Sequence, residues 1–200
     1  MTFAFTGVVS NVAPSLFTSG SNFNSSQLLS GSYTFNDLTS DQNDASNIAR
    51  YDNAITGLTV NIGGSYSATL VSPGSGFIAI QNNPIDRYMM QAPVTSSSPS
   101  LVHGYSPVRF RLELIDPSGT AFSSDPPALV PTTPPSLSSF AANRWRFVFE
   151  DGSGKARIQG SLSSLTAVPL PAAVILFGAG IVALVGLGAG SWRKRKNSLA

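Results

Sequence analysis

Strict alternation of apolar and polar residues is the feature that most limits how this chain can fold. Residues 108–114 read Val-Arg-Phe-Arg-Leu-Glu-Leu, and residues 144–150 read Arg-Trp-Arg-Phe-Val-Phe-Glu. A period of two places successive side chains on opposite faces of a strand, so each segment has one apolar and one polar face. Both segments are therefore expected to be strands that cover a hydrophobic core.

Shorter segments of the same kind occur along the chain, separated by turn residues. Gly63-Gly64 is expected to be a hairpin turn between two of them. The Ser-rich residues 95–100 and the Pro-rich residues 123–139 are expected to be loops or linkers. No amphipathic helix is indicated before residue 168, so the chain predicts an all-β fold, an antiparallel β-sandwich of jelly-roll-like type, in a domain of residues 1–165. The other predicted strands are residues 3–12, 30–35, 55–62, 65–71, 77–81, 86–91 and 155–162.

Charge and cysteine content exclude several classes of function. Residues 1–192 contain eight Lys and Arg against ten Asp and Glu, a net charge of −2. A mildly acidic domain gives nucleic-acid binding little support. The chain has no cysteine, which excludes disulfides, thiolate metal sites and cysteine nucleophiles.

An uncharged apolar segment follows the β domain. No charged residue occurs between Leu170 and Trp192, and as a helix this stretch would be long enough to cross a bilayer. A buried core helix is the alternative, but such a helix rarely lacks a polar face over five turns. Since basic flanks stay in the cytoplasm, the expected arrangement is a single-pass envelope protein with its N-terminal domain outside, anchored in the lipid bilayer. The predicted basic anchor on the cytoplasmic side is Arg193, Lys194, Arg195 and Lys196.

A short proline motif precedes this segment and consists of Val168, Pro169, Leu170, Pro171 and Ala172. The order of motif, apolar span and basic tail resembles the sorting signals of the PEP-CTERM group, specifically the VPLPA-CTERM variant. The resemblance implies a sorting signal over 166–200, with motif 168–172, transmembrane helix 172–192 and basic tail 193–200. It also implies recognition by an exosortase, which processes such proteins at the cell surface or for secretion, in bacteria that make exopolysaccharide.

Proline chemistry is compatible with a processing site at this motif. Pro169 and Pro171 favour extended backbone at the residues before them, and an extended segment is what a protease binds. The alternative is that the prolines only mark the start of a helix. The N-terminus has no recognisable secretory signal, so a leader upstream of Met1 is expected. The competing arrangement is a tail-anchored protein with the opposite topology.

Four arginines on the two strongest predicted strands are candidates for ligand binding. Arg109, Arg111, Arg144 and Arg146 fall on the polar faces of these strands. Guanidinium groups form forked hydrogen bonds with carboxylates and sulfates, so one shared face could bind an acidic polysaccharide. The simpler interpretation is a solubilising surface beside Glu113 and Glu150.

Carboxylates offer two further hypotheses. Asp37, Asp41 and Asp44, with Asp52 nearby, could supply oxygen ligands to Ca²⁺, although no EF-hand spacing is present and a polar loop is the simpler interpretation. Glycoside hydrolysis would require a pair of carboxylates across a cleft. The candidates for that pair are Glu113, Asp116, Glu150 and Asp151.

Two other patterns resemble catalytic or phosphate-binding motifs only superficially. His103, the only histidine, lies in a predicted loop without a Gly-x-Ser-x-Gly elbow. Residues 152–155, Gly-Ser-Gly-Lys, lack the spacing and following helix of a phosphate loop and are expected to be a hairpin turn.

The resemblance to the VPLPA-CTERM group therefore implies a non-enzymatic surface or extracellular-matrix protein associated with exopolysaccharide, with no cofactor expected. A lectin-like carbohydrate-binding module, a permanently anchored single-span protein and an exported hydrolase are the alternatives.

Overall fold

The structure is a computed structural model that describes residues 1–16, 23–98 and 102–169. Within these ranges the regular structure is antiparallel sheet plus two short 3₁₀ turns, η1 (Pro14–Leu16) and η2 (Leu137–Ser139). The strands are β1 (Thr2–Val12), β2 (Leu28–Phe35), β3 (Ile48–Asp52), β4 (Ile55–Ile62), β5 (Tyr66–Leu70), β6 (Phe77–Gln81), β7 (Asp86–Ser98), β8 (Ser106–Asp116), β9 (Ala142–Glu150) and β10 (Lys155–Ala167).

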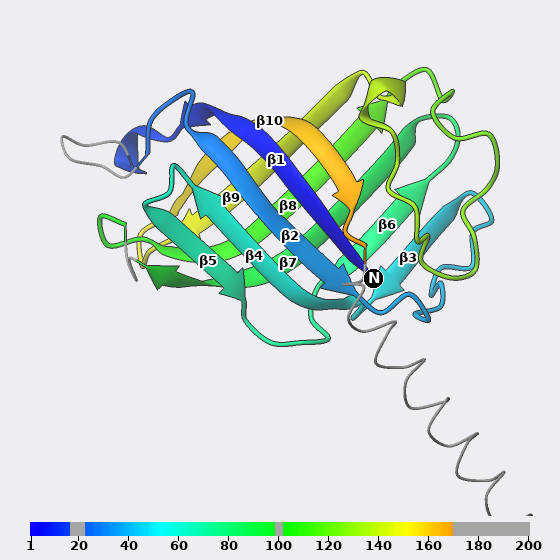
Figure 1. Cartoon of the computed structure of the whole chain (residues 1–200), viewed down its shortest axis with the longest axis horizontal. Coiled ribbons are helices and arrows are strands. Elements are labelled where there is room, and N and C mark those ends of the chain that lie inside the picture. Colours follow the sequence, from blue (N-terminus) through cyan, green and yellow to red (C-terminus); the bar gives the residue numbers. More distant parts are fainter. Residues whose placement is uncertain (17–22, 99–101, 170–200) are drawn as a thin grey trace, which may run out of the picture. The chain divides into compact units, whose positions relative to one another are not determined.

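All ten strands belong to one sheet, which closes on itself because β7 pairs with β8. The ring runs β8-β7-β5-β4-β2-β1-β10-β9 and returns to β8. Its front wall in Figure 1 includes β1, β2 and β4, with β7 and β8 behind. β7 has two partners on its other edge, since its first half pairs with β6 and its second half with β5. β6 in turn pairs with β3, so these two strands extend the wall beyond the ring.

The predicted β-sandwich of jelly-roll-like type is therefore wrong, because the sheet is a closed eight-stranded barrel and not two separate sheets. Closure depends on the length of β7, which runs on through Pro93 to Ser98. The Ser-rich residues 95–98, expected to be a linker, pair with β5 instead. Serine and threonine are only weakly distinguished as apolar or polar. Residues 95–98 therefore lack the clear alternation from which a strand is predicted.

The interior of the ring is filled by aromatic side chains. Phe5 stacks on Phe110 with ring centroids 5.4 Å apart, and Phe147 and Phe149 lie 4.7 Å apart. The hydroxyl groups of Tyr33 and Tyr88 are hydrogen bonded to each other at 2.8 Å in the same interior. Aromatic pairs of this kind stabilise a core beyond the burial of their area. The alternating segments of the sequence do supply this core, as predicted, although the walls around it are arranged differently.

Trp145 fits against the β1–β10 pair because two glycines leave room for its indole. Its Nε1 donates a hydrogen bond to the Val8 carbonyl at 3.3 Å. A Cβ at Gly160 would lie 1.8 Å from that carbonyl oxygen and 2.8 Å from Trp145 Nε1, and a Cβ at Gly7 would lie 2.4 Å from the Ser161 carbonyl oxygen. No side chain fits at either position unless the two strands and the indole separate.

We expect Gly160→Ala to lower the free energy of unfolding by about 2 kcal/mol or more, because the added methyl group overpacks this contact. For a domain of this size each kcal/mol lowers the melting temperature by roughly 2–4 °C. Gly152→Ala is the control, because nothing lies within 4 Å of its Cβ position. Denaturant unfolding curves of the two variants test the packing, and equal stabilities would contradict it.

Within the described ranges, no helix is both long enough and apolar enough to cross a bilayer. The predicted span, residues 172–192, and the basic anchor, residues 193–196, lie outside those ranges. The predictions of a C-terminal membrane helix and of a single-pass location in the cell envelope are therefore corrected, because no described element supplies a span. Both are withdrawn.

The paired part of the chain ends immediately before the proline motif. β10 ends at Ala167, and the Val168 N–H donates a last hydrogen bond to the Thr2 carbonyl at 2.9 Å. Val168 and Pro169 are exposed, while the other motif residues, 170–172, lie outside the described ranges. Residues 1–168 form one compact unit, which is close to the predicted domain of residues 1–165.

Candidate functional site

The positive charge of the domain is gathered on one wall of the closed sheet. Of the eight Lys and Arg residues in the described ranges, seven lie on β7, β8, β9 and β10. They are Arg87, Arg109, Arg111, Arg144, Arg146, Lys155 and Arg157. In each strand they alternate with buried residues, so their side chains point away from the core. We call this outer face of β7–β10 the cationic face.

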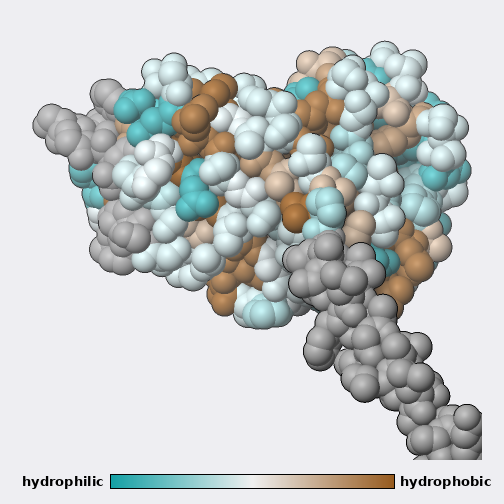
Figure 2. All heavy atoms as spheres, viewed as in Figure 1, coloured by the Kyte–Doolittle hydropathy of each residue, from teal (hydrophilic) through white to brown (hydrophobic). Residues whose placement is uncertain are grey.

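The opposite wall carries no charge at all. β1, β2, β4 and β5 contain no Asp, Glu, Lys or Arg, and their outward positions are mainly Ser, Thr and Asn. Figure 2 shows this side of the molecule, where side chains of intermediate hydropathy predominate. The charges on the other wall are therefore a local feature and not the general solvation pattern of this sheet.

Strand register places four arginines of the cationic face in two neighbouring rows. Arg111 on β8 is directly opposite Arg146 on β9. In the next row Val148 of β9 lies between Arg109 of β8 and Arg157 of β10. Directly opposed residues have Cβ atoms only about 5 Å apart, and like charges at that distance destabilise a sheet. Such an arrangement is favourable only when a negative charge approaches it.

Glu113 supplies part of that negative charge from beneath the arginines. Its side chain is only 2% exposed, and its Oε1 accepts hydrogen bonds from Nε and Nη2 of Arg87. Arg111 Nη1 lies 3.7 Å from Oε1, and Arg144 Nε lies 3.2 Å from Oε2. Burial raises the pKa of Glu113, but the Arg87 hydrogen bond and the charges of the three arginines outweigh it, so the pKa is lowered. Glu113 is therefore an ionised counter-charge.

One buried carboxylate does not neutralise the whole face. Burial lowers the pKa of Arg111, and the charges of Arg87, Arg109 and Arg146 lower it further, against the opposing effect of Glu113. The guanidinium of Arg111 is held in place by a 3.1 Å hydrogen bond from its Nε to Gln91 Oε1. Because burial and the neighbouring arginines disfavour the charged guanidinium, an anion bound beside Arg111 would stabilise its charged form.

Three arginines on this face, Arg109, Arg146 and Arg157, form no ion pair with any carboxylate in the described ranges. They surround two shallow hollows that share Arg109, Val148 and Arg157. One hollow, of about 250 Å³, also includes Lys155, and the other, of about 110 Å³, includes Arg111 and Arg146. The site is a small apolar floor at Val148 ringed by guanidinium groups.

The sequence predicted four residues of this face, and the structure shows which of them act together. Arg109, Arg111 and Arg146 do line one common hollow, whereas Arg144 is turned toward Glu113. Sequence reasoning missed Arg87 and Arg157. Alternation in residues 155–162 could have placed Arg157 on the outer face, because Ala156 and Ile158 are buried. Nothing in the sequence could have placed Arg87, because its contact with Glu113 depends on the β7–β8 pairing.

The carboxylates proposed for hydrolysis each have a structural partner. Hydrogen bonds from the Ser118 hydroxyl and from backbone N–H groups of Thr120 and Ser118 hold the pKa of Asp116 well below its usual range. Hydrogen bonds from Ser153, first from its hydroxyl, likewise lower the pKa of Asp151. A general acid needs the opposite shift.

The residues that the sequence suggested for metal binding, phosphate binding or histidine chemistry lie mostly in loops and turns. Asp41 Oδ1 accepts hydrogen bonds from the backbone N–H groups of Asn43 and Arg50. The bond from Arg50 covers part of the edge of β3 that does not pair with β6. In the described ranges no three His, Cys, Asp or Glu side chains gather into a possible metal site, so Asp37, Asp41 and Asp44 are not brought together as ligands. Gly152, Ser153 and Gly154 lie in the β9–β10 hairpin turn, as predicted, and Lys155 begins β10 opposite Glu150. His103 lies in the turn between Val102 and Tyr105 with a φ of 51°.

Comparison with known proteins adds no family to this description. A scan of protein-family models, a search of curated proteins and a search of solved structures each gave no match. The resemblance of residues 168–172 to a VPLPA-CTERM motif stays a prediction.

We expect Glu113→Gln to lower the free energy of unfolding at pH 7 by about 1–3 kcal/mol, because three guanidinium groups lose their shared counter-charge. Since the pKa of Glu113 is lowered in the folded state, its contribution is present above the ordinary glutamate pKa of about 4.3 and is lost as the pH falls through the folded value. The difference between wild type and variant should therefore shrink at acid pH.

Urea unfolding at pH 7 and at about pH 3 measures this difference, the lower value being below the ordinary glutamate pKa. Glu150→Gln is the matched control, because Glu150 is 45% exposed and its pair with Lys155, at 3.7 Å, should contribute less than about 1 kcal/mol. Equal effects of the two variants at pH 7 would show that Glu113 is not the centre of this cluster.

Proposed function

We propose that this chain is a non-enzymatic, polysaccharide-associated protein that binds acidic glycans through the cationic face. The observation that carries the proposal is the group of Arg109, Arg146 and Arg157 around the Val148 floor, without a carboxylate partner in the described ranges. Guanidinium groups bind carboxylates and sulfates through two parallel hydrogen bonds, which gives both strength and orientation.

The geometry of the rows suits a repeating anion better than a single ion. Arg109 and Arg157 lie on β8 and β10, two strand spacings apart, which corresponds to about 10 Å. Arg111 and Arg146 continue the positive charge into the next row. A polymer that carries one negative group at each repeat could contact several of these guanidiniums at once, so that weak contacts add up.

The same face is less suited to nucleic acid. Single-stranded nucleic acids bind through aromatic side chains on which their bases stack. On the cationic face, the outward positions between the arginines are held by Val148, Gln91 and Gln159, and the aromatic side chains of β8 and β9 are buried. The domain as a whole also carries more carboxylates than cations. These features favour a sugar polymer over a base-containing one.

The test is binding of the full chain to polygalacturonate, with uncharged dextran as the neutral polymer, measured by calorimetry at two salt concentrations. We expect binding to polygalacturonate alone, and weaker binding at higher salt, because exposed charges are screened. In Arg146→Gln/Arg157→Gln the affinity should fall about tenfold or more, which corresponds to about 1.4 kcal/mol.

The control for this variant is Ser30→Asp/Ser65→Asp. It changes the net charge by the same amount at two exposed positions, one on β2 and one in the β4–β5 turn, both away from the cationic face. Its affinity should stay within about twofold of wild type, less than 0.5 kcal/mol. An equal loss in both double variants would mean that only the net charge matters, and equal binding of dextran would contradict an ionic site.

A second proposal concerns processing, and it is supported by the place where strand pairing ends. The last described hydrogen bond of the closed sheet is made by Val168, the first residue of the proline motif. We propose that an enzyme of the exosortase type cuts within residues 168–172, where cleavage would leave every strand intact. Mass spectrometry of the C-terminal peptide, from cells with and without such an enzyme, should show the motif cleaved only in its presence. An uncut chain in both would contradict the proposal.

A further inference from the structure

The outer face of the sheet continues from β8 across β7 and β6 to β3, and it contains a separate hollow there. Register places Glu113, Met89, Ala79 and Arg50 in one row across the four strands. The next row contains Arg87, Gln81 and Ile48. Side chains in register share a face, so this region adjoins the cationic face without a break.

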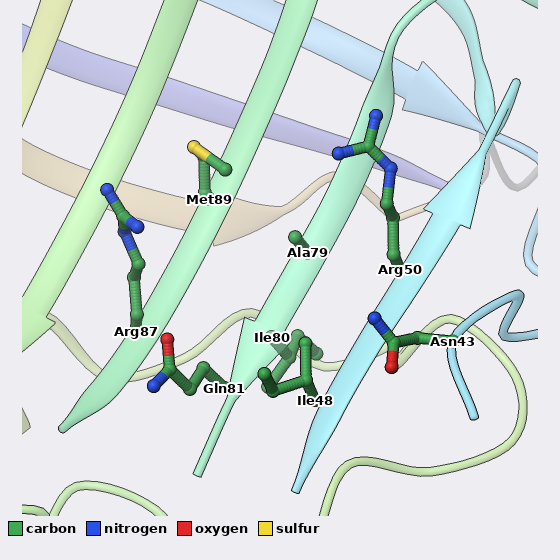
Figure 3. Close-up of a pocket in the computed structure, with 8 residues that line it drawn as sticks. All are labelled: Asn43, Ile48, Arg50, Ala79, Ile80, Gln81, Arg87 and Met89. Carbon is green, nitrogen blue, oxygen red and sulfur yellow. The ribbon is translucent and has the colours of Figure 1, made fainter. Parts of the chain in front are cut away.

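The hollow has a volume of about 200 Å³ and lies between two arginines. In Figure 3, Arg50 rises from β3 and Arg87 from β7, with Ala79 and Met89 between them. The small side chain of Ala79 forms the space, and Ile48 adds a further apolar wall. Asn43 and Gln81 supply amide groups at its rim.

Both arginines are held in place by other contacts. The guanidinium of Arg50 lies 3.8 Å from the centre of the Phe77 ring, and its Nε is 2.8 Å from Asp52 Oδ1. Arg87 is fixed by its hydrogen bonds to Glu113. A guanidinium has five N–H donors, so these contacts leave further donors for a ligand. Because the side chains are already ordered, a ligand would not have to immobilise them.

We infer that this hollow is a subsite for one uronic acid residue of an acidic polysaccharide. Its volume is below the roughly 300–1,000 Å³ of pockets that enclose drug-sized ligands, which favours a single sugar ring. The apolar floor at Ala79 and Met89 suits the C–H face of that ring, Asn43 and Gln81 suit its hydroxyl groups, and Arg50 or Arg87 suits its carboxylate. Glu113 is shared by Arg87, Arg111 and Arg144, so positive charge remains in excess on this side of the hollow and favours a sugar that carries a carboxylate.

The inference rests on the proposed function and deepens it, because it names the sugar class and places the end of the glycan beside β3. It also predicts a difference between short and long ligands. A single uronic acid should bind at the hollow alone, whereas a polymer should also contact the cationic face.

The first experiment uses the methyl group of Met89 as a reporter in the unmodified full chain. The chain has three methionines, of which Met90 is buried in the core and Met1 is the first residue, so Met89 alone lies in the hollow. Titration with galacturonic acid should shift the Met89 methyl resonance in a saturable way and leave Met90 unchanged. Galactose, which lacks the carboxylate, should shift it much less. No Met89 shift, or an equal shift with galactose, would overturn the inference.

The second experiment fills the hollow with Ala79→Leu, which changes no charge. The same substitution at Ala4, an outward position of β1, is the matched control. We expect Ala79→Leu to weaken binding of galacturonic acid at least tenfold and Ala4→Leu to leave it unchanged. Unchanged binding in Ala79→Leu would overturn the subsite.

The two proposals fail separately in these measurements. In one outcome, Arg146→Gln/Arg157→Gln loses polymer binding but galacturonic acid does not shift the Met89 resonance. This result would support the cationic face as a binding surface and contradict the subsite. In the converse outcome, galacturonic acid shifts the Met89 resonance, Ala79→Leu abolishes that shift, and Arg146→Gln/Arg157→Gln binds the polymer as wild type does. This result would support the subsite and contradict binding at the cationic face. No binding of either ligand would remove both.

Discussion

The pairing of β7 with β8 is the contact on which the rest of the structure depends. Without it the chain would be an open, curved sheet with its aromatic residues exposed along one side, and two long strand edges would be free to pair with other chains. With it, Phe5 of β1 meets Phe110 of β8 across the interior. The same pairing brings Arg87 to Glu113, so one set of backbone hydrogen bonds closes the core and assembles the charged surface. Stability and the candidate binding surface are therefore coupled.

The inward and outward faces of each strand carry different kinds of side chain. Inward positions hold rings that pack edge-to-face and stacked, and glycines appear where two strands and the Trp145 indole meet too closely for a side chain. Outward positions differ from wall to wall, from hydroxyl groups on β1, β2 and β4 to guanidiniums on β8, β9 and β10. The interior thus fixes the register, and the register fixes which charged groups become neighbours.

Local patterns in the sequence predicted the strands and the core better than their arrangement. Trp145, Phe147 and Phe149 were correctly assigned to the interior, because alternation depends only on neighbours along the chain. The closed topology was not predictable in this way, since it depends on β7 continuing through Pro93 and the weakly patterned serines after it. For the same reason Arg111 and Arg146 could be placed on one face, while the counter-charge role of Glu113 toward Arg87 could not. The proline motif at 168–172 was visible only as a sequence pattern.

The uncharged wall has a consequence for any complex in which the cationic face is occupied. A negatively charged chain lying along β8–β10 would be covered by a body whose far side presents serine, threonine and asparagine in place of charge. Molecules attached side by side along such a chain would therefore replace a repelling anionic surface with a neutral, hydrated coat. Polymer strands coated in this way could approach one another more closely than bare ones, so that the protein would act on the spacing of the strands as well as on their charge.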